Sequence, residues 1–168
     1  VEARVVRVAV VADRFHVIRI VNHHFLAAWA QLDPKGRKNR GLLSLMRRHE
    51  ENLKPEQKIR LQAYLAEHPA LEAIYEFKQR LCRLLRKKCC TAKRCRRWIR
   101  RLLNYIHQLK TCGLEQLETL GTTLGSWDEE IATMWRFTKN NGITEGFHNK
   151  MEMISRRAFG FRNFDNYR

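Results

Sequence analysis

The chain has 168 residues, of which 44% are apolar and 10% aromatic, so it is long enough for one domain and too apolar for global disorder. Its 33 lysines and arginines exceed its 17 aspartates and glutamates, which gives a formal net charge of +16. Such a surplus favours a polyanionic partner, nucleic acid before an anionic membrane surface, and no apolar run is long enough to span a bilayer.

The N-terminal stretch predicts a strand followed by a helix, with an acidic residue between them. Residues 5–12 are a continuous, largely β-branched run, typical of a strand buried on both faces. Asp13 follows this run, at the position where open α/β sheets place their ligand chemistry. Asp13 is equally suited to cap the helix that runs on to about Leu32, so the residues alone leave both roles open. His16 is placed to orient Asp13 or a phosphate.

The next part of the chain predicts helices separated by breaks. We expect a turn at residues 33–36, a short helix around residues 42–46, a helix that begins with Pro55, and a long helix after residues 68–69. The buried face of the helix after Pro55 is expected to comprise Ile59, Leu61, Tyr64 and Leu65.

Residues 77–114 contain no acidic residue and place cations between apolar side chains at helical spacing. This pattern predicts two helices, with a break near residues 90–91, that share a core and turn a cationic face outward to a phosphate backbone. A basic amphipathic membrane helix is the rival interpretation, but the aromatic and leucine side chains are needed for packing between helices. The cations of this stretch that we expect to contact DNA are Arg96, Arg97, Arg100 and Arg101.

The cysteines and glycines of this region carry two further expectations. The cysteines are odd in number and lack the Cys-x-x-Cys spacing of zinc sites, so we interpret them as reduced thiols of a cytosolic protein. Gly113 and the glycines at 121 and 125 are expected to delimit a short helix, and residues 126–129 have the pattern of a capping box ahead of another. The cysteines are Cys82, Cys89, Cys90, Cys95 and Cys112.

The C-terminal stretch predicts a helix that begins near Thr144, because the Asn-Gly pair at residues 141–142 is a strong break. Glu145 lies in the first turn, where the helix dipole favours an ionised carboxylate, as a metal ligand requires. Acidic first turns that merely stabilise a helix are common, so the position alone leaves both roles open. The apolar face comprises Phe147, Met151, Ile154 and Ala158, and the opposite face carries Glu145, His148, Glu152 and Arg156.

Two motifs and the tail carry a family resemblance. Residues 11–17, Val-Ala-Asp-Arg-Phe-His-Val, together with residues 141–152, Asn-Gly-Ile-Thr-Glu-Gly-Phe-His-Asn-Lys-Met-Glu, resemble the DDE insertion-sequence transposases, and more narrowly the ISL-three group. Residues 156–164, Arg-Arg-Ala-Phe-Gly-Phe-Arg-Asn-Phe, are similar to the closing signature of that group, with Phe159 at the usual tyrosine. The resemblance covers nearly the whole chain.

The resemblance implies an RNase H-like catalytic domain interrupted by a large all-helical insertion. The chain would then be mostly α, with one N-terminal strand and a closing helix from the α/β catalytic domain. Residues 1–32 and 137–168 would be the two parts of that split domain, and residues 33–136 the insertion. Asp13 would be the second metal-binding carboxylate and Glu145 the third, holding Mg²⁺ or Mn²⁺.

Further roles follow from the same resemblance. His16, His148 and Glu152 are accessory candidates, although family members more often carry asparagine at the position of His148 and lysine at that of Glu152. The cations expected to neutralise DNA phosphates beside the metals are Lys150, Arg156, Arg157 and Arg162.

The implied activity is metal-dependent DNA strand cleavage and strand transfer in the transposition of an insertion sequence, in the bacterial cytoplasm at the nucleoid. DNA is the implied partner, without a membrane, and a homo-oligomer on DNA stays open. Because the first catalytic aspartate is expected upstream of Val1, we expect the stretch to be a C-terminal part that is inactive alone. The alternatives are a non-catalytic basic helical DNA- or RNA-binding domain and, third, a basic peripheral membrane protein.

Overall fold

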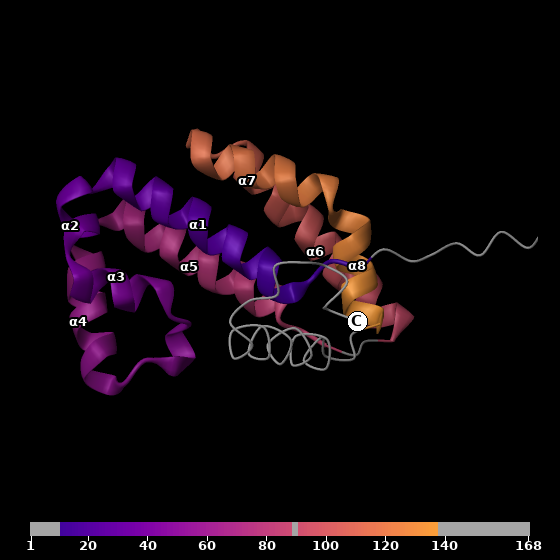
Figure 1. Ribbon diagram of the computed structural model, residues 1–168, viewed down its shortest axis with the longest axis horizontal. Coiled ribbons are helices and arrows are strands. Elements are labelled where there is room, and N and C mark those ends of the chain that lie inside the picture. Colours follow the sequence, from indigo (N-terminus) through magenta and orange to yellow (C-terminus); the bar gives the residue numbers. More distant parts are fainter. Residues whose placement is uncertain (1–10, 89–90, 138–168) are drawn as a thin grey trace, which may run out of the picture. The chain divides into compact units, whose positions relative to one another are not determined.

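A computed structural model describes residues 11–88 and 91–137, which form helices joined by short connections (Figure 1). Within these ranges no residue lies in a strand, so the expected mostly-α character is confirmed. The expected strand at residues 5–12 and the closing helix after residue 142 lie outside the described ranges, apart from residues 11 and 12. The elements are α1 (Arg14–Leu32), α2 (Pro34–Lys38), α3 (Arg40–Arg47), η1 (Glu50–Asn52), α4 (Pro55–Ala66), α5 (Pro69–Leu85), α6 (Ala92–Lys110), α7 (Glu115–Ser126) and α8 (Asp128–Phe137).

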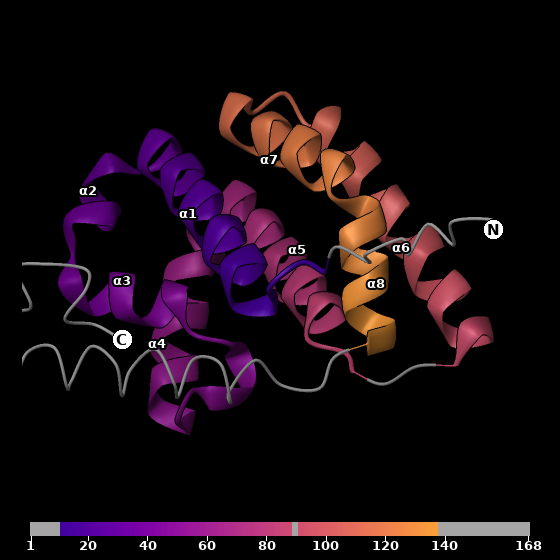
Figure 2. The same ribbon diagram turned by 45° about the vertical axis from the view of Figure 1, so that its right-hand side comes forward.

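The long helices α1 and α5 lie side by side and contribute to both hydrophobic clusters of this unit (Figures 1 and 2). The first cluster joins the N-terminal part of α1 and the C-terminal part of α5 to α6, α7 and α8. The second joins the other ends of α1 and α5 to α3 and α4, around the fully buried Trp29. Helices on both sides of residue 32 therefore share a core, while the expected division into residues 1–32 and 33–136 stays a prediction.

Capping side chains and prolines determine where most of the helices begin. Asp13 caps α1, and Pro34, Pro55 and Pro69 occupy the first turns of α2, α4 and α5, where a missing backbone N–H costs nothing. The turn expected at residues 33–36 is instead the start of α2, because the Asp33 carboxylate accepts a hydrogen bond from Gly36 N at 3.0 Å and caps a new helix.

The expected burial of Ile59 was wrong, since its exposed fraction is 67%. Helix α4 buries Leu61 and Leu65, which are four residues apart and share a face, with Tyr64 half-buried beside them. Ile59 lies two residues before Leu61 and so points to a different side of the helix.

One lysine and one glutamine side chain of α5 form hydrogen bonds at the C-terminal end of α3 and just beyond it. Lys78 is buried and its ammonium group donates to the Met46 carbonyl, one of the last carbonyls of α3. Gln79 accepts from Glu50 N at 3.2 Å and donates to the Arg48 carbonyl at 3.1 Å. Burial lowers the pKa of Lys78 to about 8. Lys78, which the sequence grouped with the outward cations, is therefore a core residue.

The glycines at 121 and 125 do not end a helix, because α7 runs through both to Ser126. At Gly121 an added Cβ would lie 3.0 Å from the Leu109 Cβ and 3.1 Å from the Lys110 backbone nitrogen, so glycine allows α7 to approach α6 closely. The expected capping box is also wrong: Ser126 closes α7 and its hydroxyl donates to the Thr123 carbonyl at 2.8 Å.

The two glycines are expected to respond oppositely to alanine. Gly121→Ala forces α6 and α7 apart and should lower the free energy of unfolding by about 1–3 kcal/mol. Gly125→Ala meets only ordinary contacts, the nearest at 3.4 Å, and should raise it by about 0.5–1 kcal/mol through helix propensity. Urea unfolding of both variants checks this pair, and equal effects would contradict the packing role of Gly121.

Candidate functional site

The position of Asp13 is fixed by the residues on both sides of it. Ala12 N donates to the Glu130 carbonyl of α8 at 3.3 Å. Arg14 reaches the end of α5, where its Nε donates to the Leu85 carbonyl at 3.2 Å and its Nη2 to the Lys87 carbonyl at 3.1 Å. Figure 2 shows the N-terminal end of α1 beside α5 and α8. The Asp13 backbone is thus held by two other helical segments.

One oxygen of the Asp13 carboxylate caps helix α1, and the other takes no part in the cap. Oδ1 accepts from Phe15 N at 3.0 Å, so the capping role that the sequence left open is confirmed. Oδ2 lies 3.4 Å from His16 Nε2, and the two side chains are 36% and 64% exposed. His16 therefore does lie beside Asp13, as expected, and the cap does not use Oδ2 of this partly exposed side chain.

The other metal-site candidates belong to the C-terminal stretch of the chain. Glu145, His148 and Glu152 lie outside the described residues, as do the expected phosphate contacts of the C-terminal stretch, namely Lys150, Arg156, Arg157 and Arg162. In residues 11–88 and 91–137, no three His, Cys, Asp or Glu side chains form a group that could hold a metal ion. The metal-binding roles of Asp13 and Glu145 stay predictions.

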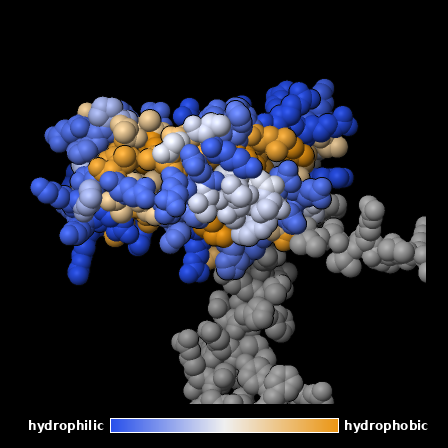
Figure 3. Space-filling model, turned by 90° about the horizontal axis from the view of Figure 1, so that it is seen from above, coloured by the Kyte–Doolittle hydropathy of each residue, from blue (hydrophilic) through white to orange (hydrophobic). Residues whose placement is uncertain are grey.

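The four arginines predicted on α6 are all exposed, opposite the buried side chains of Cys95, Leu102 and Ile106. Within the part of the chain that the structure describes, none of these arginines forms an ion pair. A view from above shows a largely hydrophilic surface interrupted by apolar patches (Figure 3). The four residues, Arg96, Arg97, Arg100 and Arg101, are free to meet external anions.

The described cysteines offer no site of their own. Cys82 and Cys95 are buried and Cys112 is exposed, and all three are free thiols. Burial raises the pKa of the Cys82 thiol to about 11, which keeps it protonated and unreactive.

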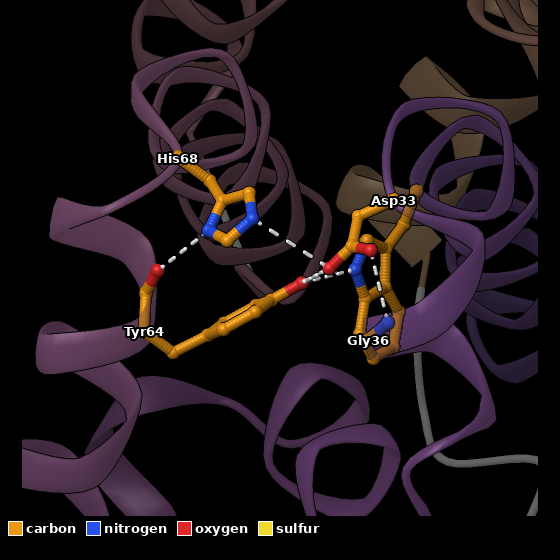
Figure 4. Close-up of polar contacts among 5 residues, drawn as sticks. Asp33, Gly36, Tyr64 and His68 are labelled. Carbon is orange, nitrogen blue, oxygen red and sulfur yellow. Dashed lines mark hydrogen bonds and ion pairs between the residues drawn. The ribbon is translucent and has the colours of Figure 1, made fainter.

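A second polar cluster, which the sequence did not indicate, joins the end of α1 and the start of α2 to α4 and to the residue just before α5 (Figure 4). The Tyr64 hydroxyl donates to Asp33 Oδ2 at 2.6 Å and accepts from Trp29 Nε1 at 2.8 Å. His68 Nε2 lies 3.7 Å from the same Asp33 oxygen, and its Nδ1 lies 3.0 Å from the Tyr64 carbonyl.

The protonation of this cluster follows from its contacts. The Gly36 N–H and then the Tyr64 hydroxyl lower the pKa of Asp33, whereas burial and then Asp33 raise the pKa of Tyr64 to about 12. Both Asp33 oxygens are occupied by these internal contacts, so the cluster is structural and provides no further catalytic carboxylate.

Comparison with known proteins shows to which family the chain belongs. A family model described as a transposase, the DDE model of the ISL-three group, matches residues 1–168. The chain belongs to this transposase family. The family resemblance drawn from the sequence is therefore confirmed.

One transposase relative matches most of this chain. The transposase for insertion sequence element IS1001 of Bordetella parapertussis is 28% identical over 120 residues, which cover 71% of this chain and 28% of that protein. The match thus spans less than a third of the relative's length. No solved structure matches the chain. Among the helices described for this transposase chain, none is long and apolar enough to cross a membrane.

Proposed function

We propose that Asp13 and Glu145 are the second and third metal-binding carboxylates of a DDE transposase, whose full-length form cleaves and transfers DNA strands when an insertion sequence moves. The observation that carries the proposal is the partly exposed Asp13 carboxylate, whose backbone is anchored on two sides while Oδ2 takes no part in the helix cap. Membership of the transposase family supports it. In this proposal residues 1–32 and 137–168 belong to a split RNase H-like domain, and residues 33–136 are its helical insertion.

The donor atoms suit Mg²⁺ or Mn²⁺, which are hard cations that prefer carboxylate oxygens. When bound, two such ions stabilise the charge on the attacking and leaving oxygens of a phosphodiester. Asp13 and Glu145 would hold the ions, and His16, His148 and Glu152 are accessory groups. The first aspartate of the triad is not among the residues assigned here, so cleavage is proposed for the longer transposase and not for these 168 residues alone.

The remaining charged groups are assigned to DNA. Arginine side chains pair with phosphate through two parallel hydrogen bonds, which suits both orientation and charge neutralisation. The protein would work on DNA in the bacterial cytoplasm, at the nucleoid. The assigned contacts are Lys150, Arg156, Arg157 and Arg162 near the metals, and Arg96, Arg97, Arg100 and Arg101 on α6.

The test is strand cleavage by the full-length transposase on DNA that carries the element's ends, with Mg²⁺ or Mn²⁺. Glu145→Gln should reduce cleavage by about 1,000-fold, since a metal ion contributes several kcal/mol to the transition state and each 1.4 kcal/mol is tenfold. EDTA should abolish cleavage by the wild type. Glu129→Gln, which removes an exposed carboxylate of α8, is the control and should cleave normally. Wild-type cleavage by Glu145→Gln would overturn the assignment.

A non-catalytic nucleic-acid-binding role is the second candidate, and the exposed arginines of α6 favour it. Simple binding requires neither Asp13 nor Glu145. DNA binding without any metal-dependent cleavage by the full-length wild type would therefore select this role.

A further inference from the structure

An open groove lies between helices α5 and α6, and the charged residues that line it are all cationic. The groove has a volume of about 390 Å³. Arg80, Arg83 and Lys87 line it from α5 and the residues just after it, and Arg101, Asn104 and Tyr105 line it from α6, with Leu84 completing the wall. No carboxylate of residues 11–88 or 91–137 lines the groove.

The spacing on each helix explains why these side chains converge. Arg80 and Arg83 are three residues apart, and Arg101 is three and four residues from Asn104 and Tyr105, so each set shares one helix face. The adjoining Leu81, Leu85 and Leu102 are buried in the first hydrophobic cluster, which fixes the direction of both faces. The cationic lining is therefore held by the core and not by surface loops.

The cations have few internal partners. Arg80 and Arg101 form no ion pair within the described ranges. Arg83 lies 4.0 Å from Glu50, with both side chains largely exposed, and such pairs contribute at most about 1 kcal/mol. The Lys87 ammonium lies over the Trp98 ring, 4.9 Å from its centroid, and forms no ion pair with a described carboxylate.

The lining chemistry matches a phosphodiester chain. The guanidinium groups of the arginines and the ammonium group of the lysine supply positive charge. The Asn104 amide and the Tyr105 hydroxyl supply neutral hydrogen-bond donors of the kind that position a DNA backbone. Arg80 and Arg83 lie about 4.5 Å apart along the helix axis, so α5 presents closely spaced positive charges to a DNA strand, which carries one phosphate about every 3.4 Å of duplex axis. A flat bilayer surface would reach the rim of a groove and not its interior.

We propose that the groove lined by Arg80, Arg83, Lys87, Arg101, Asn104 and Tyr105 binds the phosphate backbone of double-stranded DNA. The proposal rests on the proposed function, because it takes DNA as the partner, and it adds a contact separate from the metal-binding carboxylates. Four of its residues bear charge, so it contributes to affinity without reading sequence.

The test is DNA binding by the full-length transposase at several salt concentrations, using a double-stranded fragment without the element's ends. Arg80→Ala combined with Arg101→Ala should weaken binding at least tenfold, and the slope of log K against log salt should fall by about 2, one for each lost phosphate contact. The charge-matched control is Lys35→Ala with Lys38→Ala, which removes two exposed lysines of α2. Circular dichroism melting of both double variants verifies that each remains folded.

The outcomes separate the two proposals. Equal losses in the groove variant and the α2 control would overturn the groove while leaving DNA as the partner. Absence of DNA binding by the wild type would overturn the proposed function itself. Groove-dependent binding to vesicles that contain phosphatidylserine, with DNA binding unchanged, would overturn the groove's assignment to DNA.

Discussion

Asp13→Asn is expected to leave the helical unit folded and to reduce DNA strand cleavage by the full-length transposase about 1,000-fold. Asparagine caps helices as well as aspartate does, so it can accept the hydrogen bond from Phe15 N that holds the first turn of α1. It removes the negative charge that a metal ligand needs. Cleavage assays and thermal melting, performed on the same preparations, separate these two consequences.

Asp13→Ala provides the comparison, because it removes both functions. Loss of the cap should lower the free energy of unfolding by about 1 kcal/mol, whereas Asp13→Asn should not change it measurably. Cleavage should be lost equally in both variants. If Asp13→Asn cleaves DNA at the wild-type rate, Asp13 is only a cap and the metal assignment is wrong.

Tyr64→Phe is expected to lower the free energy of unfolding by about 3 kcal/mol without altering side-chain volume appreciably. It removes a hydrogen bond to the Asp33 carboxylate and leaves the Trp29 N–H, on a fully buried side chain, without its acceptor. Bonds to charged groups contribute about 1.5–3 kcal/mol, and an unsatisfied buried donor costs about 1–3 kcal/mol. Equilibrium unfolding in urea measures the change.

Tyr75→Phe is the matched control in the same hydrophobic cluster. The Tyr75 hydroxyl is buried without a hydrogen-bond partner among the described residues, since nearby Gln79 makes no bond of ordinary geometry with it. Its removal should therefore be neutral or slightly stabilising. A loss as large as that of Tyr64→Phe would show that the hydroxyl network is not the cause.

The same cluster makes the stability of the protein depend on pH in the acidic range. Because the pKa of Asp33 lies below its ordinary value of 3.8 in the folded state, the unfolded chain binds a proton more readily. The stability that this carboxylate contributes is complete at neutral pH and is lost as the pH falls through the lowered pKa. Tyr64→Phe removes one cause of the shift, so its stability should fall less steeply in acid than that of the wild type.

The sequence predicted what local chemistry determines. The starts of α1, α4 and α5 follow from Asp13, Pro55 and Pro69, whose effects depend only on their neighbours in the chain. The exposed face of α6 followed from the absence of acidic residues between 77 and 114, because a cation without a partner is costly to bury.

What the sequence missed depends on contacts between distant residues. Gly121 has the signature of a helix end, and only the approach of α6 explains its place within α7. Lys78 has the signature of a surface cation, and only the Met46 carbonyl explains its burial. The α5–α6 groove likewise requires two faces to meet. Glu145 lies outside the described residues, so its pairing with Asp13 stays a prediction.

The two hydrogen bonds of Arg14 have a mechanical consequence. They bind the residue next to Asp13 to the carbonyls of Leu85 and Lys87, and Lys87 also lines the cationic groove. The distance between the Asp13 carboxylate and the α5 side of the groove therefore stays constant while these two hydrogen bonds are intact. The helical bundle would therefore keep a constant distance between the groove proposed to bind the DNA backbone and the carboxylate proposed to bind a metal ion.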